Sequence, residues 1–292
     1  MALIGVIGGS GLYEIAGLEN ARRVEIDTPF GPPSDGYVLG RLDGHDLAFL
    51  PRHGLGHRIL PSELNFRANI YGFKSLGADA ILSVSAVGSL REEIEPGHVV
   101  VPDQFIDRTR GRISTFFGEG LVAHVSFSDP FCPSISPILA EAAREVGAVV
   151  HRGGTYVCME GPQFSTRAES HLYRSWGGDI IGMTNLQEAK LAREAEICFA
   201  TLALATDYDC WRTAEESVAI EDVLRILTEN ADRATRAVTL AALQIDEKRT
   251  CGCRRALDNA IITAPGIMPR ERLEALWTIV GRALHKRPGE GA

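Results

Sequence analysis

Apolar runs alternate with amphipathic segments along the whole chain. Short apolar runs bounded by turn-forming residues predict strands at Leu3–Ile7, Asp46–Leu50, Ala80–Ser85, His98–Val101, Gly154–Cys158, Asp179–Gly182 and Ile197–Thr206. Apolar residues at helical spacing predict helices over Ser62–Leu76, Ser136–Val146, Thr166–Ser175, Gln187–Ala195 and Ile220–Leu243. This alternation is typical of an α/β fold and not of separate all-β and all-α modules.

The end of the chain has a different pattern. Gln244–Thr250 is polar, a Cys-x-Cys motif follows at Cys251, and Arg270–His285 has helical periodicity. We therefore divide the chain into a single main domain, residues 1–245, and a C-terminal extension, residues 246–292. Within the main domain, Thr28–Gly36 and Arg108–Gly120 are too long for tight turns, and loops of that size usually border a site or an oligomer contact.

Composition excludes several classes of protein. The chain has 292 residues, 45% of them apolar, and a formal net charge of -8, which argues against a nucleic-acid surface because such surfaces are basic. No apolar run approaches the roughly 20 residues that a membrane-spanning helix needs. The first residues lack the basic region of a signal peptide. We expect a cytoplasmic protein with no nucleic-acid or membrane partner.

Six cysteines are scattered through the sequence. Cys158 and Cys198 lie within apolar runs and are interpreted as buried hydrophobic residues. Cys251-Gly252-Cys253 could close a small disulfide, ligate a metal ion, or consist of inert thiols. A single Cys-x-Cys without a second cluster at ligand spacing is a weak metal signal, so we expect no metal site.

Two carboxylates, Asp207 and Asp209, end the longest apolar run. In an extended chain, residues two apart point the same way. Ligands of open α/β sheets bind at the carboxyl ends of strands, so the acid pair indicates a site. The alternative is that the two Asp residues only stabilise a turn.

Donors suited to phosphate follow several other strands. Gly8-Gly9-Ser10-Gly11-Leu12 follows the first strand, and its N–H groups and hydroxyl can donate to an anion. It matches neither a dinucleotide fingerprint nor a Walker loop. Arg52 and His53 follow the second strand, Ser85 ends the third, and Thr184 follows Asp179–Gly182. Each has an ordinary alternative as a surface charge or a cap, but together they predict one anion pocket facing two acids.

Phosphate held in such a pocket can attack a sugar carbon. Phosphorolysis of an N-glycosidic bond fits this arrangement, with the sugar gaining oxocarbenium character as in other glycosyl transfers. Asp207 would then act as a general acid toward purine N7, which requires burial to raise its pKa. Asp209 could accept a hydrogen bond from an exocyclic amino group.

Separated motifs give the chain a marked family resemblance from Ile4 to about Leu243. They are Ile7-Gly8-Gly9-Ser10-Gly11-Leu12, Pro51-Arg52-His53-Gly54, Ser85-Ala86-Val87-Gly88, Glu160-Gly161-Pro162-Gln163-Phe164-Ser165-Thr166-Arg167-Ala168-Glu169, Gly182-Met183-Thr184 and Ala205-Thr206-Asp207-Tyr208-Asp209-Cys210-Trp211. With them the chain resembles the purine nucleoside phosphorylase superfamily, specifically its 5'-methylthioadenosine phosphorylase branch. The resemblance implies a mixed central β-sheet flanked by helices. It also implies a pentosyltransferase that uses inorganic phosphate as co-substrate and needs no cofactor.

The resemblance also implies roles for particular residues. Phosphate would contact Ser10, Arg52, His53, Ser85, Ala86 and Thr184. The base would be held by Phe164, Ser165, Asp207 and Asp209, and the ribose would contact Met183. The 5' substituent would contact Ile220, Val223 and Leu224. His124 would reach the site of a neighbouring subunit in a homotrimer. Purine and methionine salvage is the metabolic setting that the resemblance implies.

Substrate choice within the family depends on two features. An ionised Asp209 accepts a hydrogen bond and so matches the 6-amino group of adenine, where 6-oxopurine enzymes typically have Asn. Apolar Ile220 should favour binding of a methylthio group over a hydroxyl, by roughly 1–3 kcal/mol of binding free energy. Departures from the family pattern are Gln187 in place of Pro, Gln163 in place of Arg, and Ser10 in place of Thr.

Three alternatives remain open at this point. They are a 6-oxopurine phosphorylase of the methylthioinosine or inosine type, a phosphate-independent nucleosidase, and a non-catalytic nucleoside sensor. A dinucleotide oxidoreductase is excluded because its fingerprint is missing.

Overall fold

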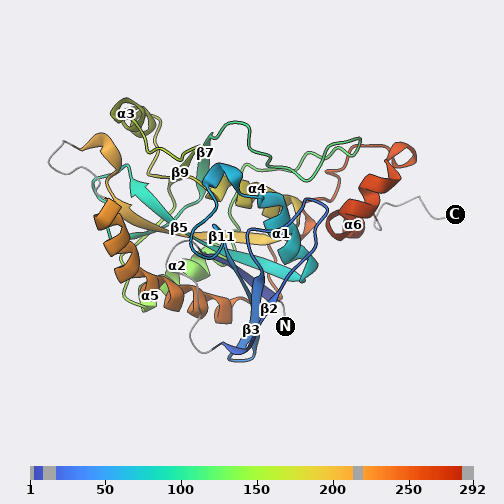
Figure 1. Cartoon of the computed structure of the whole chain (residues 1–292), viewed down its shortest axis with the longest axis horizontal. Helices are drawn as coiled ribbons and strands as arrows, with labels where there is room; N and C mark the ends of the chain where they lie inside the picture. The colour runs from blue at the N-terminus through green and yellow to red at the C-terminus, as the bar shows by residue number, and fades with distance from the viewer. Residues whose placement is uncertain (1–2, 9–17, 213–219, 285–292) are drawn as a thin grey trace.

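A single mixed sheet of eleven strands forms the centre of the molecule (Figure 1). The computed structural model describes residues 3–8, 18–212 and 220–284, and only the backbone of residues 220–230. The strands are β1 (Leu3–Gly8), β2 (Glu19–Val24), β3 (Tyr37–Leu42), β4 (His45–Pro51), β5 (Ala78–Ser89), β6 (Val99–Val101), β7 (Gln104–Arg108), β8 (Val150–Arg152), β9 (Thr155–Met159), β10 (Ile180–Gly182) and β11 (Cys198–Asp207). The helices are α1 (Phe66–Ser75), α2 (Ile135–Glu145), α3 (Arg167–Ser175), α4 (Asn185–Glu194), α5 (Ile220–Gln244) and α6 (Arg270–Leu284).

The sheet branches at β5. One path runs β2-β3-β4-β1-β5-β10-β9-β7, and a second leaves β5 through β11 to β6 and β8. β5 is parallel to β1 and to β11 along most of its length, while its last residues, Gly88 and Ser89, pair antiparallel with β10. The carboxyl ends of β5 and β11 therefore lie next to β10, and the residues that follow these strands gather at one place.

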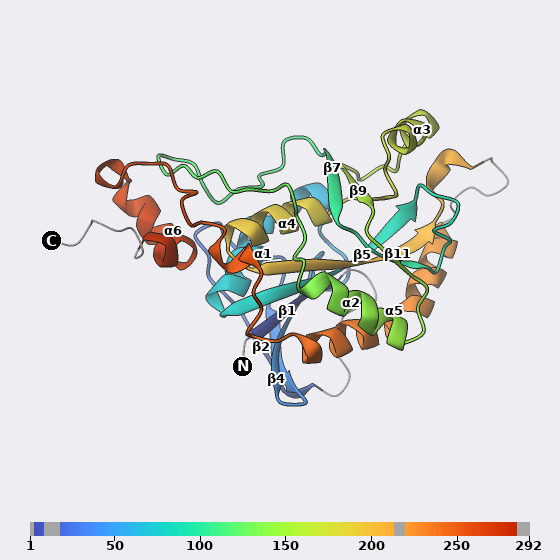
Figure 2. The ribbon, with the colours of Figure 1, turned by 180° about the vertical axis from the view of Figure 1, so that it is seen from behind.

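Helices cover both faces of the sheet (Figures 1 and 2). α1 and α4 pack together on one face, while α2 and α5 pack together on β11 from the other. Alternation along each strand divides the core between the faces: Ile4 and Val6 of β1 pack on the α2–α5 side, and Ile7 packs on the α1–α4 side. Such sheets need apolar residues on both faces because both are buried.

The C-terminal extension shares this core. Leu257, Ile261 and Leu276 belong to the α1–α4 side of the core, and Cys253 belongs to the α2–α5 side. Helix α6 contacts α1 and lies at the end of the molecule away from α3 (Figure 1). In the part of the chain that the structure describes, no helix is both long enough and apolar enough to cross a membrane.

Every strand and helix expected from the pattern is present, with shifted ends. The helix predicted from Ser62 begins at Phe66, because Pro61–Glu63 forms a separate 3-10 turn. Helix α4 begins at Asn185, two residues before the predicted start. Strands β2, β3, β7 and β8 were not predicted from the sequence. The apolar signal of two of them is weak: β2 is exposed along most of its length and β8 has only three residues.

Candidate active site

A cavity of about 290 Å³ opens at the carboxyl ends of β5, β10 and β11. Its lining includes most of the predicted site residues, namely Arg52, His53, Ser85, Ala86, Phe164, Met183, Thr184, Asp207 and Asp209. It also includes residues that the sequence analysis did not select, among them His57, Val87, Gly88, Met159, Ile181 and Thr206. The acids and the phosphate-type donors therefore share one cavity.

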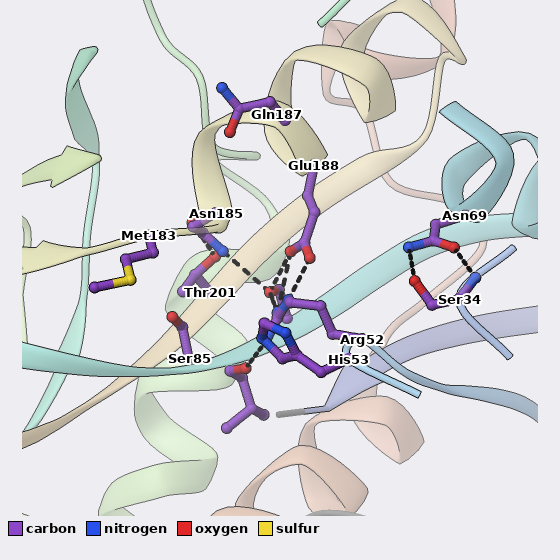
Figure 3. Close-up of polar contacts among 12 residues, drawn as sticks. Ser34, Arg52, His53, Asn69, Ser85, Met183, Asn185, Gln187, Glu188 and Thr201 are labelled. Atoms are coloured by element: carbon purple, nitrogen blue, oxygen red, sulfur yellow. Dashed lines mark hydrogen bonds and ion pairs between the residues drawn. The ribbon is translucent and has the colours of Figure 1, made fainter. Parts of the chain in front are cut away.

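Arg52 lines this cavity and is almost completely buried. Figure 3 shows its polar contacts. Its Nε and Nη2 donate to the two carboxylate oxygens of Glu188, at 2.5 and 3.1 Å. Nη2 also donates to Ser83 Oγ at 2.7 Å, and Nη1 donates to the Val84 carbonyl at 2.9 Å. The guanidinium fork is thus engaged by the protein, and one Nη1 hydrogen has no acceptor among the described residues.

His53 lies beside Arg52 and is held as a neutral ring. Its Nδ1 is 2.8 Å from the carbonyl oxygen of Ile59, and its ring stacks on His57 with centroids 4.2 Å apart. Burial lowers the pKa of His53 to about 4, and the charge of Arg52 adds to the effect. Because Nδ1 donates to the carbonyl, Nε2 of the neutral ring is a hydrogen-bond acceptor.

Ser85 and Thr184 contribute hydroxyls from two different elements. The Ser85 hydroxyl lies 3.2 Å from the hydroxyl of Tyr156, which is fully buried beneath it. Thr184 occupies the N-cap position of α4, yet its side chain makes no capping hydrogen bond. A helix N-terminus favours anions, so this hydroxyl and the start of α4 are both suited to a phosphate group.

A buried polar network stands behind these donors (Figure 3). The Ser83 hydroxyl donates to Glu188 at 2.8 Å and accepts from Asn185 at 3.0 Å, and Asn185 Oδ1 accepts from Thr201 at 2.9 Å. All four of these side chains are buried. Fully hydrogen-bonded networks of this kind are rigid, so this one fixes Arg52 relative to α4 and β11.

Asp207 ends β11 with both carboxylate oxygens engaged. Thr206 Oγ1 donates to Oδ2 at 2.7 Å, and the backbone N–H of Asp209 donates to Oδ1 at 2.7 Å. Burial raises the pKa of Asp207, although these two hydrogen bonds oppose the effect. Gly88 lies close to this carboxylate: a Cβ there would be 3.0 Å from Asp207 Oδ1, so a larger residue would crowd the acid.

Asp209 reaches the same cavity by a different backbone route from the one predicted. The chain does not stay extended after Asp207: Asp209 starts a 3-10 turn with φ of 49°. The backbone N–H of Asp209 donates to the Asp207 carboxylate, and the two side chains do not lie side by side on one extended strand. Asp209 Oδ2 is buried and has no partner at ordinary hydrogen-bond geometry among the described residues. Burial raises the pKa of this carboxyl, and the nearby Ser170 and Ser165 side chains oppose the effect. A buried carboxylate oxygen without a donor is costly, so this atom is suited to an incoming N–H group.

Phe164 and Met183 supply an apolar wall, and Phe164 is 61% exposed in the single chain. Ser165 does not line the cavity. Its hydroxyl lies 3.8 Å from the Met159 sulfur, and its carbonyl accepts a hydrogen bond from the Cys210 thiol. Its side chain also acts to lower the pKa of the Asp209 carboxyl, against the effect of burial. Ser165 therefore lies next to Asp209 without facing the cavity itself.

The remaining predicted residues are not placed in this cavity. His124 is exposed and lines a separate depression with Ser114, Phe127 and Lys190. Ser10 lies outside the described residues, as do the side chains of Ile220, Val223 and Leu224 at the start of α5.

Comparison with known proteins identifies the family. The model of a family described as the phosphorylase superfamily matches residues 3–243. The chain belongs to the phosphorylase superfamily. An S-methyl-5'-thioadenosine phosphorylase of Geobacter sulfurreducens is 58% identical, with 96% of this chain and 98% of that protein covered. A second, from Koribacter versatilis, is 57% identical, with 96% of both chains covered.

Solved structures agree with the sequence comparison. A methylthioadenosine phosphorylase from an antarctic soil metagenomic library superimposes with a TM-score of 0.90 at 51% identity, covering 94% of this chain and 98% of that one. A methylthioadenosine phosphorylase from Schistosoma mansoni in complex with adenine superimposes with a TM-score of 0.83 at 37% identity, covering 88% and 97%. The expected fold, a mixed sheet flanked by helices, is confirmed.

This phosphorylase contains one further organising group, Arg112, which the sequence analysis missed. Arg112 is buried in the loop after β7 and donates from Nε to Glu160 Oε1 at 3.0 Å. It also donates to the backbone carbonyls of Glu160 and Met183, and to Gln187 Oε1 at 3.3 Å. Gln187 in turn donates to Thr109 at 2.9 Å. Gln187, where the family often has Pro, thus ties this loop to α4.

Proposed function

We propose that the chain cleaves S-methyl-5'-thioadenosine with inorganic phosphate, releasing adenine and 5-methylthioribose 1-phosphate. The observation that carries this proposal is the two-part cavity, in which phosphate-type donors face two acids whose pKa is raised by burial. The names of the relatives covering almost the full chain support it. The proposed enzyme is therefore a pentosyltransferase.

Phosphate would be held by the groups at one end of the cavity. The free hydrogen of Arg52 Nη1, the hydroxyls of Ser85 and Thr184, the Ala86 backbone and the start of α4 supply donors; Ser10 is assigned by the family motif alone. A neutral His53 would accept a hydrogen bond from the hydroxyl of monoprotonated phosphate through Nε2. This leaves an unprotonated phosphate oxygen as the attacking atom.

Proton transfer to the base completes the reaction. As a phosphate oxygen forms its bond to C1' of the ribose, the C1'–N9 bond breaks and its electron pair moves into the purine. Asp207 gives its proton to N7, so that adenine leaves as a neutral molecule. Burial raises the pKa of Asp207 toward the working range of a general acid.

Asp209 would select adenine. Its Oδ2 is buried without a partner among the described residues. The Ser170 and Ser165 side chains favour the ionised form against the effect of burial, and an ionised carboxylate can only accept hydrogen bonds. The 6-amino group of adenine donates, whereas the 6-oxo group of hypoxanthine does not. The mismatch favours the amino substrate over a 6-oxopurine.

A homotrimer belongs to this proposal. His124 is exposed and outside the cavity of its own chain, as expected of a side chain offered to a neighbour. The apolar residues Ile220, Val223 and Leu224 would surround the methylthio group. We also propose that residues 1–245 form the catalytic domain and that residues 246–292 brace it. A reducing cytoplasm fits the six free thiols.

The deciding experiment incubates the purified protein with methylthioadenosine, with and without phosphate, and follows adenine release. The proposal expects release only with phosphate, together with 5-methylthioribose 1-phosphate in equal amount. Release without phosphate would identify a nucleosidase. Faster turnover of methylthioinosine than of methylthioadenosine would overturn the assignment of Asp209.

A further inference from the structure

Four cysteines from three parts of the chain meet at one point. Cys132 precedes α2, Cys198 begins β11, and Cys251 and Cys253 form the Cys-x-Cys motif of the extension. Their four Sγ atoms all lie within 4.8 Å of one another, and those of Cys198 and Cys251 are 3.4 Å apart. None of the four lines the substrate cavity. The fold therefore supplies the second pair of thiols that the isolated motif lacked.

The arrangement matches the ligand shell of one metal ion. Zinc bound by four thiolates has Zn–S distances of about 2.3 Å in a tetrahedron, which places the sulfur atoms about 3.8 Å apart. Two disulfides would require only that the sulfurs approach in pairs, whereas a single ion requires all of them to converge. Thiolate-only ligand sets favour zinc among the common divalent ions.

Burial indicates a closed site. Cys132, Cys198 and Cys253 are buried and Cys251 is half-buried. With four protein ligands no position remains for water, as in structural zinc sites and unlike catalytic ones.

A buried cation stands beside the cluster. The side chain of Arg249 is 3% exposed, and its Nη2 binds Asp79 Oδ2 at 2.5 Å. Its Nε is buried without a hydrogen-bond partner among the described residues. A zinc ion with four thiolates carries a net charge of about -2, and an N–H donor beside it would stabilise the ligands.

We propose that Cys132, Cys198, Cys251 and Cys253 bind one structural zinc ion. The ion would fasten the C-terminal extension to the start of β11 and to the segment before α2. It would add its binding free energy to folding, as structural zinc does elsewhere. The proposal replaces the expectation of no metal, and it is independent of the reaction that the cavity catalyses.

Zinc content of the full-length protein tests this directly. The protein is purified in reducing, chelator-free buffer, and zinc is counted by plasma mass spectrometry while thiols are counted by intact mass under non-reducing conditions. The proposal expects one zinc per chain, with four sulfur neighbours at about 2.3 Å by X-ray absorption. Zinc-free protein, whether its four cysteines are disulfide-bonded or remain free thiols, would overturn it.

Variants locate the site. Cys253→Ser should lose the zinc and melt at a lower temperature, while Cys210→Ser, which removes a thiol outside the cluster, should keep it. Cobalt substitution gives a second readout, because four thiolates produce an intense charge-transfer band that Cys253→Ser should abolish. Zinc retained in full by Cys253→Ser would contradict the assignment even if the wild-type protein contains zinc.

Discussion

Arg52 and Glu188 form a buried, two-point ion pair at the cavity, with their side chains 2% and 1% exposed. The carboxylate neutralises the guanidinium before any ligand arrives. It also fixes the one Nη1 hydrogen that no described residue accepts. The pair thus converts Arg52 from a free bidentate phosphate clamp into a rigid single donor.

Removing Glu188 should destabilise the protein. Glu188→Ala leaves a buried charge without its partner, which typically costs about 3–5 kcal/mol, and Glu188→Gln should lose less because one acceptor remains. Chemical unfolding followed by circular dichroism measures the loss. Glu141→Ala is the matched control, since its ion pair with Arg144 is about half exposed and should change stability by less than about 0.5 kcal/mol. Equal effects of the Glu188→Ala and Glu141→Ala variants would contradict this account.

Asp207→Asn should lose most turnover. An amide cannot give its proton to N7, and general acids contribute roughly 10²–10⁴-fold. The kcat for methylthioadenosine should fall within that range, while phosphate binding measured by calorimetry should survive. Unchanged kcat would mean that another group protonates the base.

Asp209→Asn should relax the choice of base. An Asn amide can donate to a 6-oxo group, and a buried polar mismatch is strongly penalised. The ratio of kcat/KM for methylthioadenosine over methylthioinosine should fall at least about tenfold, equivalent to about 1.4 kcal/mol. Asp207→Asn, which should slow both substrates alike, serves as the comparison. An unaltered ratio would remove Asp209 from base selection.

His53 should make the protein acid-sensitive. Its pKa falls from 6.5 in the unfolded chain to about 4 in the fold. Above pH 6.5 the ring is therefore neutral in both states, and its titration does not change the free energy of unfolding. As the pH falls from 6.5 to 4, only the unfolded state binds the proton, and stability falls by on the order of 2–3 kcal/mol. His53→Asn can keep the donor to Ile59 without titrating, so its melting temperature should depend less steeply on pH. The exposed His171→Asn should retain the wild-type slope.

Shared sites can be tested by mixing two defective subunits. If His124 completes the neighbouring site, co-expressed His124→Ala and Asp207→Asn chains should form some sites with both residues intact. Activity of the mixed oligomers should then exceed that of either variant alone. Light scattering should give the mass of a trimer, and mixing that yields only the average of the two activities would argue for sites within single chains.

The strong signals of the sequence concern strands buried on both faces and the polar residues that end them. β5 and β11 are almost wholly buried, so their patterns predicted both the elements and the positions of Ser85 and Asp207. Strand β2 gave no such signal, because a charged, exposed strand resembles a loop.

Long-range partners could not be predicted in the same way. Glu188 on a helix is indistinguishable from a solvated acid until the fold places Arg52 against it, 136 residues away. Arg112 likewise is an ordinary loop arginine until Glu160 and Met183 surround it. The convergence of Cys132 and Cys198 on the Cys-x-Cys motif depends on tertiary packing for the same reason.

The backbone N–H of His124 donates to the carbonyl of Ala260 at 2.9 Å, and Ala123 forms a β-bridge with Ile261. The segment around His124, which the proposed trimer would offer to the neighbour, is therefore held by the C-terminal extension. In the proposed trimer, damage to the extension of one subunit, by oxidation of its thiols or by proteolysis, would impair the active site of the next subunit more than its own. Each damaged extension would then inactivate one neighbouring site, and an intact extension on the preceding subunit would keep a site active even when the subunit's own extension is damaged.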